Sequence, residues 1–223
     1  MSLIFEKCIE TANVIKQKIK KFSDETKVEC GETLVDIEDT IYSSLRFRRA
    51  HVSIVDARET KNLWLLHVTI FPHTNDPSPI YGFDIIAGPN KVSGAFHDFS
   101  ESGDSENFMY KWFQEQTADL DWNKPRELPL WAKQIFSPGM IAIGAVGLEE
   151  LEKFVDVGLK NLDYYLNNVG IEQQSMFDYH MAQNKYCRYQ KENPQTPKVL
   201  VAIGFDKQQA DNFVQNNLFP EIG

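Results

Sequence analysis

Two polar side chains occupy strand positions where the hydrophobic pattern predicts buried faces. His67 alternates with apolar residues in LWLLHVTIF, and Asp84 does the same in IYGFDIIAG. Burial favours the neutral form of a carboxyl group and lowers the pKa of a histidine. If the two side chains are neighbours, they can share a proton and act as donor and relay near neutral pH. The alternative is that Asp84 is a hydrogen-bonded turn or edge residue and His67 a satisfied core histidine.

The elements that must position these residues are strands. Residues 26–100 contain five segments rich in β-branched and aromatic residues, and turn sequences separate them. The short Gly88-Pro89-Asn90 turn favours an antiparallel hairpin, and the apolar residues on both sides of LWLLHVTIF indicate a sheet covered on both faces. The predicted strands are Glu32–Ser43, Arg48–Asp56, Leu63–Phe71, Ile80–Ala87 and Val92–Phe99, with a further strand in IAIGAV at 141–146.

Helical periodicity appears at the start of the chain and in its second half. The predicted helices cover 4–22, 148–166, 172–191 and 206–217, the last with Asp206 as its N-cap, and a loop lies at 192–197. No repeat, linker or low-complexity tract divides the chain. We therefore expect one domain over residues 1–223, an α/β/α three-layer sandwich with a central antiparallel sheet flanked by helices on both faces.

Composition excludes several classes of protein. The chain has 223 residues, 42% hydrophobic and 25% charged, with a formal net charge of −9. An acidic balance disfavours general nucleic-acid binding, which depends on neutralising phosphates. We expect no contact with a membrane, because no run of about 18 apolar residues is free of charges. Cys8, Cys30 and Cys187 are odd in number and far apart, which predicts a reduced, cytoplasmic protein.

Common catalytic signatures are missing from the sequence. It contains no GxGxxG, P-loop, HExxH or GxSxG motif, and its histidines lack the spacing of metal ligands. We therefore expect no bound metal. An acid/base hydrolase using Asp84 and Asp98 has little support, because Asp98 in HDFSES is expected to cap a turn.

Three sequence blocks resemble the ferredoxin-dependent bilin reductases. The runs RRAH, LLHVTIFP and PIYGFDIIAGPNKVSGAFHDFS span Arg48–Ser100 and keep His67 and Asp84 in place. ELPLWAKQIFS at 127–137 forms a second block, and a weaker one runs from Tyr186 through Gln190 and Asn193 to Phe219. The first forty or so residues show no useful match. The chain is most similar to the phycocyanobilin-forming branch and its phage and metagenomic relatives.

The resemblance implies a substrate, a partner and roles for particular residues. Similar proteins hold biliverdin IXα between the sheet and the C-terminal helices and reduce it by single electrons from ferredoxin, each coupled to a proton. They are usually monomers and bind no flavin, nicotinamide or metal. The resemblance implies Asp84 as the catalytic proton donor, His67 as its catalytic partner and His51 as a second histidine linked to the first. It also implies supporting or substrate-binding roles for Ser53, Ser93, Gln190 and Asn193.

Departures from the family pattern concern the product. Phycocyanobilin-forming enzymes use a glutamate where this chain has Ser53, and a hydroxyl is no comparable acid at neutral pH. We therefore expect a four-electron reduction to phycoerythrobilin through 15,16-dihydrobiliverdin. The alternatives are reduction to phycocyanobilin with a different second donor, or a non-catalytic bilin carrier. Asn193 stands where many relatives have an aspartate, so a second acid from that loop is not expected.

Basic residues are candidates for two further contacts. The IAIGAV strand lacks the arginine that meets a bilin propionate in close relatives, which leaves Arg188, Lys191 or Lys198 for this role. Each of them is also well explained as a solvated helix charge. Ferredoxins are acidic, so docking to this acidic chain would need a local basic patch. The candidates are Arg46, Arg48, Arg49, Lys185, Arg188 and Lys198.

Overall fold

The computed structural model describes residues 2–28, 35–171 and 176–223. These residues form a seven-stranded antiparallel sheet in which each strand lies beside its neighbour in sequence. The predicted positions 32–34 and 172–175, together with Cys30, lie outside the described residues. The strands are β1 (Asp24–Val28), β2 (Asp36–Ser43), β3 (Phe47–Ala57), β4 (Leu63–Pro72), β5 (Ile80–Ala87), β6 (Val92–Ser100) and β7 (Ile141–Ile143).

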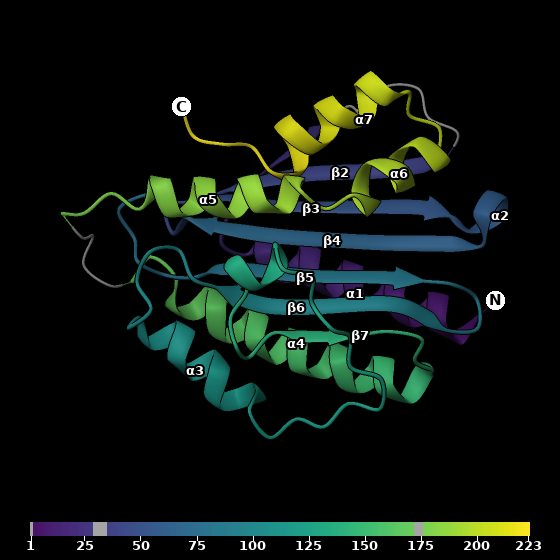
Figure 1. Ribbon diagram of the computed structural model, residues 1–223, viewed down its shortest axis with the longest axis horizontal. Helices are drawn as coiled ribbons and strands as arrows, with labels where there is room; N and C mark the ends of the chain where they lie inside the picture. The colour runs from purple at the N-terminus through teal and green to yellow at the C-terminus, as the bar shows by residue number, and fades with distance from the viewer. Residues whose placement is uncertain (1, 29–34, 172–175) are drawn as a thin grey trace.

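Helices cover both faces of the sheet, which confirms the predicted sandwich (Figure 1). One face packs against α1 (Leu3–Lys20), α3 (Phe108–Thr117) and α4 (Leu148–Asn168). We call it the core face. The other face lies under the C-terminal helices, and we call it the site face. Its cover consists of η1 (Ala132–Gln134), α5 (His180–Lys191), α6 (Gln195–Ala202), α7 (Lys207–Phe213) and the π-helix η2 (Val214–Leu218).

The core face is closely packed because the amphipathic helices α1 and α4 turn their apolar stripes toward the sheet. On α4, Gly158 lies directly over β5. A Cβ atom at this position would come within 2.2 Å of the Phe83 ring, so any larger residue would push the helix off the sheet. Within the described residues, no helix combines the length and apolar character needed to cross a bilayer.

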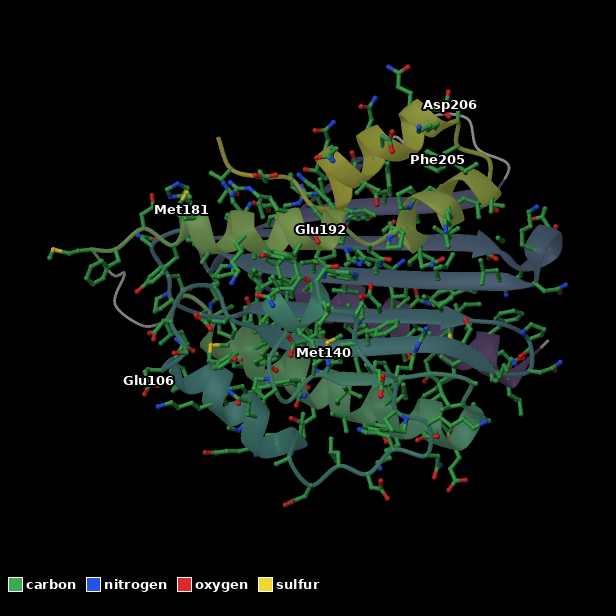
Figure 2. The ribbon with its side chains drawn as sticks, in the orientation of Figure 1. Glu106, Met140, Met181, Glu192, Phe205 and Asp206 are labelled. Atoms are coloured by element: carbon green, nitrogen blue, oxygen red, sulfur yellow. The ribbon has the colours of Figure 1, made fainter. Side chains whose placement is uncertain are left out.

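Two sequence predictions about the C-terminal helices are corrected. The helix expected over 172–191 begins only at His180, where the side chain of Asp178 accepts a hydrogen bond from the backbone N–H. The loop expected at 192–197 is helical from Gln195 onward, because Pro197 falls in the first turn of α6, where its missing N–H is not needed. Asp206 caps α7 as predicted, and Figure 2 shows it beside Phe205 in the bend after α6.

Besides α6, several elements escaped the sequence analysis, among them β1, α3 and the one-turn helix after β3. β1 is an edge strand of mostly polar residues, so it lacks an apolar alternation. The helix α3 begins at an Asn107 N-cap, whose side chain accepts from the Met109 N–H at 2.9 Å. The one-turn helix α2 (Arg58–Lys61) replaces a simple turn between β3 and β4 and ends at Asn62, which has a positive φ of 51°.

Candidate functional site

The site face is partly open where β4, β5 and β6 lie side by side. Along β4 and β5, side chains that point to the core face are buried, whereas many that point to the site face are only half-buried. This partly exposed surface includes His67 and Asp84, together with the apolar Leu63, Leu65, Ile86 and Phe96. The site face therefore presents an apolar surface with an acid and an imidazole at its centre.

The sheet register brings His67 and Asp84 together as directly paired residues of β4 and β5. His67 Nδ1 lies 2.6 Å from Asp84 Oδ1, and His67 Nε2 lies 2.8 Å from the hydroxyl of Thr69. The side chains of His67 and Asp84 are 19% and 33% exposed, so the carboxyl is less desolvated than the sequence pattern suggested. With Nδ1–H donating to the carboxylate and the Thr69 hydroxyl donating to Nε2, the pair can hold one proton beside an accessible surface.

A second carboxylate–histidine pair lies beside the first. His51 Nε2 is 2.6 Å from Asp39 Oδ1, and both side chains are fully buried. The His51 ring lies 5.8 Å from the ring of His67, centroid to centroid. The sequence analysis found His51 through the resemblance but missed Asp39, which lies on β2 in a stretch of mixed polarity.

Burial and hydrogen bonding fix the charge of this second pair. Burial lowers the pKa of His51 more than Asp39 raises it, so the imidazole is neutral at physiological pH. Burial acts to raise the pKa of Asp39, but hydrogen bonds and the charge interaction with His51 outweigh it and hold that pKa below its usual range. Ser53 and Asn217 also donate hydrogen bonds to Asp39. An ionised Asp39 beside a neutral His51 requires the proton on Nε2.

Asp98 is not the turn cap that the sequence suggested. It lies within β6 and is 1% exposed. It accepts hydrogen bonds from Ser100 Oγ and from both the backbone N–H and the hydroxyl of Ser137. Burial raises its pKa to about 6 in spite of these bonds. Asp98 thus fastens the 127–137 block to the sheet, a contact that no local sequence signal predicts.

The C-terminal helices bring aromatic and amide groups over the site. Tyr186 is buried, and burial raises the pKa of its hydroxyl well above the usual range, with smaller contributions that include the charges of Asp84 and Asp98. Gln190 Nε2 donates to this hydroxyl at 2.8 Å, which places the predicted Gln190 at the site. The Phe219 ring contacts His67 edge to face, with 5.6 Å between ring centroids.

Three other predicted supporting residues have different surroundings. Ser53 is buried on the site face, directly paired with His67, and bonds to Asp39. Ser93 is exposed, and its hydroxyl donates to the carbonyl of Ile86 across the hairpin. Asn193 accepts from the Gln195 N–H at 3.0 Å, so its side chain is used at the start of α6.

Several of the candidate cations are already bonded within the chain. Arg188 and Lys191 both form ion pairs with Glu221, at 2.8 and 2.9 Å. Arg48 donates to the side chain of Gln183, Arg49 to the carbonyl of Asn217 and Arg46 to the carbonyl of Leu166. Lys185, Arg188 and Lys198 are the exposed members of the proposed docking patch, and of these Arg188 is already paired with Glu221.

Arg126 is a cation at the site that the sequence analysis did not single out. Its guanidinium lies 5.4 Å from the centre of the Phe96 ring, and Phe96 is the direct β6 partner of Asp84. Arg126 is exposed and forms no ion pair within 4.0 Å with any residue that the structure describes. Its backbone N–H bonds to the carbonyl of Ala142, beside the β7 strand where the expected arginine is missing.

Comparison with protein families matches residues 3–220 to the family described as ferredoxin-dependent bilin reductase. The phycocyanobilin:ferredoxin oxidoreductase of Trichodesmium erythraeum is 27% identical over 195 residues, which cover 85% of this chain and 78% of that protein. The enzyme of the same name from Synechococcus sp. (strain CC9902) is 32% identical over 198 residues, covering 85% and 77%. The one from Prochlorococcus marinus (strain MIT 9303) is 31% identical over 197 residues, covering 86% and 73%.

Two solved structures share the fold of this chain. The structure of PcyX superposes with a TM-score of 0.66 at 27% identity and covers 97% of this chain and 99% of its own. Tomato phytochromobilin synthase, solved in complex with biliverdin, superposes with a TM-score of 0.71. At 12% identity, covering 96% of this chain and 82% of that one, this second likeness establishes the fold alone.

Proposed function

The chain belongs to the ferredoxin-dependent bilin reductases and is a bilin oxidoreductase, and from this premise we propose that it reduces biliverdin IXα by four electrons to phycoerythrobilin. The observation that carries the proposal is the directly paired His67 and Asp84 at the centre of a half-buried apolar surface. A flat, conjugated substrate fits such a surface, and its reduction requires a proton with each electron.

In the proposed mechanism the chain's own residues supply the protons. Asp84 delivers a proton to the bilin, and His67, held at 2.6 Å, replaces it. Thr69 bonds the other nitrogen of His67 and keeps the ring oriented. Electrons arrive singly from external reduced ferredoxin, and the bilin carries the odd electron. We therefore propose no resident flavin, nicotinamide or metal.

Ser53 supports phycoerythrobilin as the product. It occupies the position of the glutamate that serves D-ring reduction in phycocyanobilin-forming enzymes, and a serine is no comparable acid. The nearest carboxylate, Asp39, is a poor replacement because its pKa is lowered and His51 and Asn217 bond its two oxygens. Phycocyanobilin remains the second candidate, because the curated relatives named above carry that product in their names.

Substrate carboxylates need a cation at the edge of the apolar surface. We propose Arg126 for this role in place of Arg188 and Lys191, which already share Glu221. The guanidinium of Arg126 lies over Phe96, and Phe96 is the strand partner of Asp84. Arg126 has no ion-pair partner among the described side chains. Its planar guanidinium suits a carboxylate.

Ferredoxin docking is proposed at the exposed cations Lys185, Arg188 and Lys198. Because the chain carries a net charge of −9, long-range attraction to an acidic partner is weak and the contact must be local. Added salt should weaken the apparent affinity for ferredoxin. An affinity that does not change with salt would contradict a charged docking patch.

The deciding experiment is anaerobic turnover of biliverdin with reduced ferredoxin, followed by chromatography of the final bilin. Phycoerythrobilin, preceded by 15,16-dihydrobiliverdin, is the expected product. A stable complex with unchanged absorption would instead identify a bilin carrier. Phycocyanobilin would overturn the assignment based on Ser53. Ser53→Glu is expected to add a minor fraction of D-ring-reduced product, since the residues that would support the new acid are missing. Ser105→Glu is the matched control on an exposed position.

A further inference from the structure

Asp39 and His51 form a buried polar pair that the proposed proton transfer does not yet use. Both side chains have no exposed surface, and the pair lies next to His67 on the site face. Burying a carboxylate is costly unless its oxygens are bonded. Here the cost is offset by hydrogen bonds from His51, Ser53 and Asn217. A buried ion pair is weak evidence for stability, so the role of this pair is better sought in what it orients.

The pair leaves one nitrogen of His51 without a partner. Nε2 is taken by Asp39, while Nδ1 is buried and has no hydrogen-bond partner among the residues that the structure describes. A neutral imidazole carries one N–H and one lone pair, and the bond made by one nitrogen decides the state of the other. With the Nε2 proton directed at Asp39, Nδ1 must be the lone-pair acceptor.

We propose that Asp39 is a positioning residue for the proton relay. Asp39 holds His51 as the neutral Nε2–H tautomer and so keeps the lone pair of His51 Nδ1 available beside His67. This inference rests on the proposed function, since it assumes that His67 returns protons to Asp84. A neutral His51 places no second positive charge next to a protonated His67.

Asn217 connects this pair to the cover of the site. Its side chain donates to Asp39 Oδ2 at 3.3 Å, and its carbonyl accepts from Arg49 at 2.5 Å. Asn217 lies in the π-helix η2, an irregular helix type that is frequent at functional sites. Two residues later, Phe219 contacts His67. The carboxylate that orients His51 therefore also anchors the segment that lies against His67.

The test combines histidine NMR with turnover. In ¹⁵N-histidine-labelled protein, the His51 signals are assigned as those that disappear in a His51→Gln variant. At neutral pH, His51 of the wild-type protein should be in the Nε2–H tautomer. Asp39→Asn keeps an oxygen acceptor but removes the charge, and should give a mixture of tautomers. Its kcat should fall about tenfold or more, by analogy with other residues that orient a reacting group, with KM within twofold. Asp36→Asn, the same change at an exposed position of the same strand, should leave both readouts unchanged.

Each outcome decides the matter. An Nδ1–H tautomer in wild type, or an Asp39→Asn variant that behaves like Asp36→Asn, would overturn the role of Asp39. If Asp39→Asn does not fold, the tautomer of His51 in wild type still provides a test. The milder Asn217→Ala variant provides a second one, because it should shift the His51 signals and lower kcat. Failure of wild type to reduce biliverdin would count against the proposed function, whereas the tautomer is measured without turnover.

Discussion

On strand β6, His97 points into the core face of the sheet and the next residue, Asp98, into the site face. His97 is fully buried among aromatic rings, and both of its nitrogens bond to groups that do not ionise, the Gly82 carbonyl and the Asn161 side chain. Burial lowers its pKa to about 4. His97 therefore stays neutral and serves packing.

The histidines of the site face have different partners. His67 is bonded to Asp84, and both groups are partly exposed, while His51 is bonded to the buried Asp39. A histidine paired with a carboxylate at an accessible surface can exchange protons, whereas one sealed among neutral partners cannot. The comparison teaches that an ionisable partner, more than burial of the histidine, distinguishes a chemical role from a structural one, because His51 is as buried as His97.

The largest expected effect is the loss of the proton donor at the site face. Asp84→Asn should bind biliverdin but stall at a radical or partly reduced bilin, with turnover reduced at least about 10²-fold, the usual contribution of a positioned acid. Absorption spectra during anaerobic turnover measure both properties. The control is Asp119→Asn, at an exposed aspartate away from the sheet. Normal turnover by Asp84→Asn would remove this residue from the mechanism.

On the core face, a histidine substitution should affect folding alone. His97→Ala removes a packed ring and leaves Asn161 without a partner, which should lower the free energy of unfolding by about 3 kcal/mol. Turnover per folded molecule should stay within about twofold, because no ionisable partner is lost. Urea unfolding and kinetics on the same sample check this. His180→Ala, whose side chain is 37% exposed, is the control. A loss of turnover in folded His97→Ala protein would break the distinction between the two faces.

The two neighbours on β6 should respond to pH in opposite directions. Burial raises the pKa of Asp98 to about 6, above its unfolded value of 3.8, so its contribution to stability is complete at low pH and is lost as pH rises through 6. Burial lowers the pKa of His97 from 6.5 to about 4. Its contribution to stability is therefore complete above pH 6.5 and is lost as pH falls toward 4.

Substitution can separate these two titrations. When the pH is raised from 4 to 7, the stability of Asp98→Asn relative to wild type should increase by about 2 kcal/mol. The reason is that wild type ionises a buried carboxyl group in this range and the variant does not. Urea unfolding at the two pH values measures this difference. Ser137→Ala, which keeps the carboxylate, should retain the wild-type direction. An unchanged difference for Asp98→Asn would show that Asp98 does not titrate in this range.

The smallest expected effect is at the rim of the site face. Arg126→Ala should raise the KM for biliverdin about fivefold, since an exposed ion pair is worth about 1 kcal/mol. The kcat should remain near wild type, because Arg126 binds the substrate and moves no proton. Lys124→Ala, a nearby exposed cation, is the control. If both variants behave alike, Arg126 has no specific contact with the substrate.

The local pattern of the chain was enough to predict much of the sheet. Alternation and turn residues identified β2 to β6, and a short hairpin turn between β5 and β6 fixed their antiparallel pairing. The same alternation placed His67 and Asp84 each on a strand face that was expected to be buried, and the sheet register shows that these are one face. Polar or short elements escaped, as β1 and α6 show, because their signals are weak without the surfaces against which they pack.

What the sequence determined by itself is the family, and the resemblance to that family named His67 and Asp84 as partners. The sheet register of the folded chain then brought the two side chains together. The tertiary structure alone decided which further groups reach that pair. Asp39 meets His51 through strand register, and Asn217 meets Asp39 from 178 residues away in sequence. Asp98 becomes buried only when Ser137 folds over it. Desolvation and hydrogen bonding set the charge of these groups, and both depend on segments that are distant in the chain.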